Sequence, residues 1–168
     1  MRSAPATMLD KVIARVIHVM ILSMLPFTEL RVAIPYGITK GLHPVVALAA
    51  AVLATWLVII PMFLLLDLFY DRFFSRFRVI RHFVEEVRAR GAIYVERWGV
   101  LGVGIYVSLP LPGPGIYSGT VLAWLFGLPR HRAVAALAAG AFVSAVLVAA
   151  ISTPIIALIR TILHNLGY

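Results

Sequence analysis

The residues with the clearest potential for chemistry are Glu29 and Arg31, which stand in the apolar sequence LPFTELRVAIPYG between residues 25 and 37. A charge at membrane depth costs from a few to about 10 kcal/mol, so such residues mark functional sites by default. The arginine can bind a phosphate or a carboxylate. Because a carboxyl group removed from water favours its protonated form, Glu29 is the predicted proton-coupling residue.

Two steps along a helix rotate a side chain by about 200°, so Glu29 and Arg31 do not pair along one helix face. Pro35 has no N–H to donate to the Arg31 carbonyl, which leaves an open acceptor beside the cation. We expect Arg31 to bind substrate, together with Thr28 and Tyr36. The alternative is that Glu29 and Arg31 form a buried ion pair with only a structural role.

The composition points to a membrane. Of 168 residues, 62% are hydrophobic and 13% are charged, with a mean hydropathy of +0.99, whereas soluble domains carry about 25% charged residues. We expect an integral membrane protein of one domain. The net charge of +8 lies in connectors beside apolar stretches, which favours membrane lipids and not nucleic acid as the partner.

The composition also limits the chemistry. There is no cysteine, and the five histidines lack metal-ligand spacing, so we expect no metal, no cofactor and no catalytic residue. Asp10, Lys11 and Arg15 interrupt the first apolar stretch, so we expect no cleaved signal peptide.

Prolines and glycines divide the apolar sequence into segments. Pro26 separates a segment at 8–25 from one at 27–41 that is too short to cross a bilayer. Together they predict a re-entrant hairpin over about 8–41, followed by a transmembrane helix over 44–69. Residues 70–90 have apolar and charged faces, which predicts an amphipathic helix in the membrane interface; a connector helix packed on loops is the alternative.

The same order of segments then occurs again. Residues 92–109 and 115–127 flank a proline-rich run that cannot be helical, which predicts a second re-entrant hairpin over about 92–127. A transmembrane helix over 133–163 follows. Pro26 corresponds to Pro112, and Gly41-Leu42 to Gly127-Leu128, both at an offset of 86.

One crossing helix separates the two hairpins, so they would enter the membrane from opposite sides. The predicted fold is therefore an all-α integral membrane protein with two inverted repeats, 8–69 and 92–163, joined by the amphipathic helix at 70–90. Each repeat is a re-entrant helical hairpin plus a long transmembrane helix, an arrangement in which transporters bind substrate between discontinuous helices.

The turn of each predicted hairpin is called its tip: residues 26–37 form the first tip and 110–119 the second. At the second tip, helix-start amides and two hydroxyls offer an anion site, although a turn that binds no ligand is the alternative. The predicted substrate-binding residues there are Gly113, Gly115, Ile116, Tyr117, Ser118 and Gly119. The prolines that shape the tips are Pro26, Pro35, Pro110, Pro112 and Pro114.

The motif Glu29-Leu30-Arg31 before Ile34-Pro35, with Pro110-Leu111-Pro112-Gly113 and Gly115 to Gly119, resembles the prokaryotic small multi-drug export protein family over roughly residues 9–160. That family is distantly related to the DedA (VTT-domain) proteins, which share paired re-entrant hairpins and an amphipathic helix. The family typically has Thr between the two glycines and then Trp-Thr, where this chain has Pro114, Tyr117 and Ser118. The resemblance implies export, and wider relatives are implicated in flipping polyprenyl-phosphate carriers.

We therefore expect a small secondary transporter or lipid-carrier translocase, and not an enzyme. Its substrate would be amphipathic and anionic, such as a polyprenyl-phosphate-like lipid, or a small drug, and the chain would form a homo-oligomer, most simply a dimer. A non-transporting scaffold is the alternative. An intramembrane hydrolase would need a Ser–His or His–Glu constellation that the sequence lacks.

The basic residues predict the orientation in a prokaryotic cell membrane. Nine arginines lie in 70–98 and 129–132, against five basic residues predicted for the opposite face. The positive-inside rule then makes the connector at 70–98 cytoplasmic and puts both termini outside.

Overall fold

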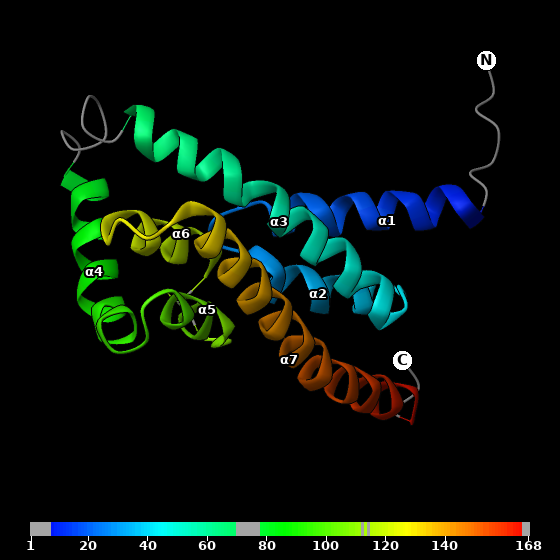
Figure 1. The fold of residues 1–168 in the computed structure, drawn as a ribbon. Helices are drawn as coiled ribbons and strands as arrows, with labels where there is room; N and C mark the ends of the chain where they lie inside the picture. Colours follow the sequence, from blue (N-terminus) through cyan, green and yellow to red (C-terminus); the bar gives the residue numbers. More distant parts are fainter. Residues whose placement is uncertain (1–7, 70–77, 112, 114, 166–168) are drawn as a thin grey trace, which may run out of the picture. The chain divides into compact units, whose positions relative to one another are not determined.

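The computed structural model describes residues 8–69, 78–111, 113 and 115–165. This part of the chain is all helical, with seven helices (Figure 1): α1 Met8–Ser23, α2 Glu29–Thr39, α3 Pro44–Phe69, α4 Arg78–Trp98, α5 Val100–Ser108, α6 Ile116–Leu125 and α7 Arg130–Asn165. Within these residues, α3 over Pro44–Leu68 and α7 over its whole length are long and apolar enough to cross a membrane. The two helices indicate a membrane protein.

The chain divides into two compact units. Unit 1 is Met1–Ala54 with Ala145–Tyr168, and unit 2 is Thr55–Ser144. Unit 1 therefore holds α1, α2, the first turns of α3 and the last turns of α7. Unit 2 holds the rest of α3 and α7 together with α4, α5 and α6.

In unit 1, α2 packs against α1 and against the start of α3. A Cβ atom at Gly37 would lie 2.8 Å from Cγ2 of Val19 and 3.0 Å from Cβ of Ala47. Leu30, Ala33 and Ile34 of α2 are buried. The small residue at 37 thus allows the close approach that holds α2, and with it the first tip, in place.

The C-terminal end of α2 is held by a glycine turn and by an arginine from α7. The N–H of Leu42 donates to the Gly37 carbonyl at 3.0 Å, and Gly41 has φ +85, which is the usual glycine stop of a helix. Nη2 of Arg160 donates to the carbonyls of Ile38 and Thr39, at 2.9 Å each. A cation on the last carbonyls stabilises a helix end.

We expect Arg160→Ala to lower the free energy of unfolding by about 1.5 kcal/mol, because it removes charge-assisted hydrogen bonds to two helix-terminal carbonyls. Denaturation by sodium dodecyl sulfate in mixed micelles measures this, followed by circular dichroism. Arg132→Ala, at an exposed position in the first turn of α7, is the matched control and should change little. Equal effects of the two substitutions would contradict the helix-capping role.

In unit 2, α4 packs on both α5 and α6, and it does not end where the sequence predicts. The sequence predicts a break near Gly91, but the helix continues to Trp98 and breaks at Gly99, whose φ is +56. A Cβ atom at Gly91 would lie 2.5 Å from Cδ1 of Leu122 in α6. Gly91 therefore permits close packing and does not terminate the helix. Residues 70–77 of the predicted amphipathic helix lie outside the described residues.

The end of α6 has the same turn as the end of α2. The N–H of Leu128 donates to the Ala123 carbonyl at 3.0 Å, and that of Gly127 to the Trp124 carbonyl at 3.0 Å. The corresponding bonds at the end of α2 lie 86 positions earlier and are also 3.0 Å long. The short helices α2 and α6 thus end in turns at Gly41 and Gly127, the two glycines that correspond in the predicted repeat.

The start of α7 differs from the expectation. The sequence predicts a helix over 133–163, yet α7 begins at Arg130, and the N–H of Ala133 donates to the Pro129 carbonyl at 2.9 Å. Proline is tolerated at a helix start, where its missing N–H would have no helical partner. By contrast, α3 has the bounds 44–69 that the sequence predicts.

Candidate functional site

Glu29 occupies an unusual position at the start of α2. Its exposed fraction is 8%, and its φ of +44 is the one positive value at a non-glycine residue in the described part of the chain. A left-handed backbone at a residue with a Cβ atom costs about 1–3 kcal/mol and persists where the surroundings impose it. A buried carboxyl group on strained backbone is therefore a strong candidate for function.

The neighbours of Glu29 in the first tip have different surroundings. The Thr28 hydroxyl donates to the Leu22 carbonyl of α1 at 2.6 Å and does not cap α2, so it fastens the tip to α1. Arg31 is partly exposed, with its Nε atom buried. The Tyr36 ring lies 5.7 Å from the Lys40 ammonium group. Pro26 is exposed in the turn, and Pro35 lies within α2.

At the second tip, the Ser118 hydroxyl ties the loop to the start of α6. Its oxygen accepts the N–H of Gly115 at 2.9 Å, and the hydroxyl donates to the Gly113 carbonyl at 2.7 Å. Ser118 is almost fully buried. The hydroxyl thus fixes the position of Gly113 relative to α6.

The other predicted residues of the second tip separate into buried and accessible positions. Gly115, Ile116 and Gly119 are buried, and a Cβ atom at Gly119 would lie 2.3 Å from Cγ2 of Val107 in α5. Tyr117 and Pro110 are partly exposed, and Gly113 is exposed. Pro112 and Pro114 lie outside the described residues.

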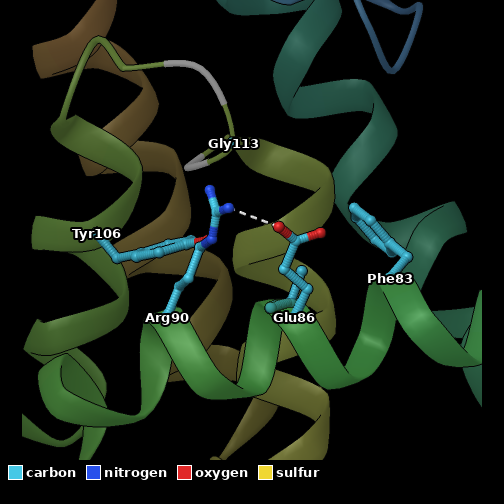
Figure 2. Close-up of a pocket in the computed structure, with 6 residues that line it drawn as sticks. Phe83, Glu86, Arg90, Tyr106 and Gly113 are labelled. Atoms are coloured by element: carbon cyan, nitrogen blue, oxygen red, sulfur yellow. Dashed lines mark ion pairs between the residues drawn. The ribbon is translucent and has the colours of Figure 1, made fainter.

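Gly113 lies at a pocket of about 270 Å³ in unit 2, which Figure 2 shows. Its lining residues are Phe83, Glu86, Val87 and Arg90 of α4, Tyr106 of α5 and Gly113 of the loop. In Figure 2 the guanidinium group of Arg90 extends from α4 toward the segment that carries Gly113. A Cβ atom at Gly113 would lie 3.5 Å from Nη1 of Arg90. The second tip is therefore accompanied by a cation from α4.

The Arg90 guanidinium is paired, but weakly. Its Nη2 atom lies 2.6 Å from Oε1 of Glu86, and the two side chains are 61% and 45% exposed. An exposed pair of this kind contributes about 0–1 kcal/mol, so a phosphate or carboxylate can replace Glu86 as the partner of Arg90 at little cost. Phe83 and Val87 supply an apolar wall. The pocket thus suits an anionic group attached to an apolar body.

Of the residues that line this pocket, sequence reasoning singled out Gly113, and not Arg90, Glu86, Phe83, Val87 or Tyr106. It predicted an amphipathic interfacial helix at 70–90 and did not associate that helix with the proline-rich run. A usable signal was present, because Phe83, Val87 and Arg90 recur at steps of four and three, which places them on one helix face. Spacing alone does not reveal that Gly113 lies beside this stripe.

In the described ranges, no group of three or more His, Asp or Glu side chains is arranged to hold a metal ion. The two candidate sites are defined by side-chain charge and by backbone geometry. One is the strained acidic turn at Glu29 in unit 1, and the other is the Arg90 pocket in unit 2.

Comparison with curated proteins and with solved structures finds no significant match. A family model matches residues 29–147, a range that begins at Glu29 and includes Arg31, α4 with Arg90, and the loop with Gly113. The family is described as one of export proteins and is not an enzyme family. The chain belongs to the small multi-drug export protein family.

Proposed function

We propose that this chain is a small secondary transporter or lipid-carrier translocase that moves an amphipathic, anionic substrate across the cell membrane with coupling to protons. The observation that carries the proposal is Glu29, a buried carboxyl group on left-handed backbone in a membrane protein. Burial and strain both cost stability, so a role in the transport cycle accounts for a glutamate at this position.

Two inverted repeats would supply the alternating access that secondary transport needs. This part of the proposal is supported by the matching turns at the ends of α2 and α6, which share their hydrogen-bond pattern at an offset of 86 residues. Helix stops of the same type, each followed by one of the long apolar helices α3 and α7, are expected of duplicated units.

The substrate would be recognised through its anionic group. Arg31 serves the first tip, and the pocket of Arg90 and Gly113 serves the second. This pocket combines one guanidinium group with an apolar wall. The combination favours a lipid phosphate, such as a polyprenyl phosphate, or an anionic drug with an apolar body.

Transport into proteoliposomes tests the proposal, with a fluorescent polyprenyl phosphate and a panel of amphipathic drugs as substrates. We expect Arg90→Gln and Arg31→Ala to raise the half-saturating concentration at least about tenfold, because each removes a charge-assisted hydrogen bond of about 1.5–3 kcal/mol. Arg88→Gln, an exposed position on α4 outside the pocket lining, is the matched control. Failure of the wild-type chain to move every substrate would overturn the transport function.

A non-transporting scaffold is the second candidate. It is favoured by the hydroxyls of Thr28 and Ser118, which are both engaged in bonds that hold the tips together. For a scaffold, Glu29→Gln would lower the thermal unfolding midpoint, and the wild-type chain would transport nothing.

The orientation is testable because the chain has no cysteine. We expect a membrane-impermeant maleimide to label Lys40→Cys in intact cells, and to label Ala89→Cys only after permeabilisation, since α4 belongs to the arginine-rich side. Both positions are exposed. The reverse labelling pattern would exclude a cytoplasmic location of α4.

A further inference from the structure

We propose that a membrane phospholipid with an anionic head group binds in a groove between α3 and α7 of unit 2. The groove has a volume of about 310 Å³ and is lined by Ile60, Phe63, Leu64, Arg130, His131 and Val134. It is separate from the residues of both candidate sites, and the lipid is a resident ligand and not the transported substrate. The proposal therefore does not depend on transport.

Two side-chain contacts set the separation of the helices that form the groove. The Trp56 indole N–H of α3 donates to the Ala138 carbonyl of α7 at 3.1 Å. Further along α3, Asp67 lies 2.5 Å from Arg130 at the start of α7. The later residue of α3 thus contacts the earlier residue of α7, so the two segments are antiparallel. The lining residues fall between these contacts, which makes the groove a built feature of unit 2.

The groove joins an apolar wall to a basic end. Ile60 and Leu64 are 60% and 50% exposed and belong to a candidate membrane span, where hydrocarbon chains are the surrounding solvent. Arg130 and His131 lie one turn before Val134, roughly 6 Å away along the helix axis at 1.5 Å per residue. In a molecule with an acyl chain and a phosphate, the chain would lie on the apolar wall and the phosphate at the basic end.

Arg130 is oriented for a ligand by a chain of contacts. Asp67 binds Nη2 of Arg130 through one carboxylate oxygen, while its other oxygen accepts the indole N–H of Trp124 at 3.0 Å. Because a guanidinium group carries five N–H donors, the contact with Asp67 leaves donors for phosphate oxygens. Asp67 and Trp124 are therefore positioning residues, and Arg130 is the predicted head-group ligand.

The charge at the basic end favours an anionic lipid over a zwitterionic one. Arg130 is the cation that lines this end of the groove, with His131 beside it, and its contact with Asp67 leaves further guanidinium N–H groups for the lipid phosphate. A choline group would bring a further positive charge to this place, whereas a glycerol head group leaves the lipid with a net negative charge.

Native mass spectrometry of the full chain in detergent tests the proposal, with equal amounts of phosphatidylglycerol and phosphatidylcholine that share the same acyl chains. We expect retention of phosphatidylglycerol to exceed that of phosphatidylcholine about fivefold or more, and Arg130→Gln to remove most of this preference, as one cationic contact implies. Arg88→Gln should leave the preference intact.

The apolar wall has its own test. Leu64→Trp fills the groove and should abolish lipid retention, whereas Leu57→Trp, at an exposed position two turns earlier on α3, should not. Because both leucines are exposed, these variants are expected to fold even if Arg130→Gln does not. Inorganic phosphate should fail to displace the lipid. Equal retention of the two lipids, unchanged retention in Leu64→Trp, or displacement by inorganic phosphate would each overturn the proposal.

Discussion

Replacement of Glu29 by glutamine is expected to abolish the response of transport to a pH gradient while the chain still folds. Glutamine has nearly the same shape and can hydrogen-bond, but it cannot release a proton. In proteoliposomes, an imposed gradient should accelerate the wild-type chain and leave Glu29→Gln at the rate seen without a gradient. Glu96→Gln, an exposed carboxyl group on α4, should respond as the wild type does. Gradient-driven transport by Glu29→Gln would remove Glu29 from the coupling step.

The backbone at this position gives an independent test of its strain. In an ordinary helix, Gly is about 1 kcal/mol less favourable than Ala. At φ +44 the order should reverse, because a Cβ atom is disfavoured in the left-handed region. We therefore expect Glu29→Gly to unfold at a higher denaturant concentration than Glu29→Ala, although both lose transport coupling. The usual order of the two variants would show that Glu29 is not strained.

The sequence predicted the helix stops that depend on local chemistry. Gly41 and Gly127 end half-length helices because the left-handed turn after a helix favours a residue without a Cβ atom, and such a turn is readable from the residue type. The start of α3 was predictable for a similar reason, since Pro44 is tolerated in a first helical turn and an unbroken apolar run follows. Local rules were sufficient at these positions.

The sequence failed where a residue type serves contacts between distant segments. Gly91 was read as a helix end, yet it accommodates Leu122, which lies 31 positions away in the chain. Arg90 was counted only among the arginines of the connector at 70–98, yet its Nη1 atom lies beside Gly113. The left-handed backbone of Glu29 could not be predicted, because a glutamate in a sequence gives no indication of a positive φ. Glu29 and Arg31 were identified because charged residues stand out in an apolar sequence. Contacts between residues that are distant in the sequence could not be identified in this way.

Gly102→Ala is expected to be the most damaging small substitution in unit 2. A Cβ atom there would lie 1.9 Å from the carbonyl oxygen of Tyr94, and that oxygen belongs to the backbone of α4, so no side-chain rotation can relieve the clash. We expect a loss of at least about 3 kcal/mol in the free energy of unfolding, since an overlap with backbone lies at the severe end of overpacking. Denaturant titration of purified protein in detergent measures this loss.

Gly127→Ala provides the comparison, because no heavy atom lies within 4 Å of a Cβ atom there and only the φ of +59 opposes the substitution. Its expected cost is about 1–2 kcal/mol.

The two variants should also differ in function. Gly102 lies one turn before Tyr106, whose side chain lines the Arg90 pocket, so separating α5 from α4 would open that pocket. Gly127→Ala should keep the wild-type half-saturating substrate concentration, whereas any folded fraction of Gly102→Ala should show a raised one. A Gly102→Ala variant as stable as Gly127→Ala would mean that α5 does not approach α4 this closely, and the pocket built on that contact would then have to be rejected.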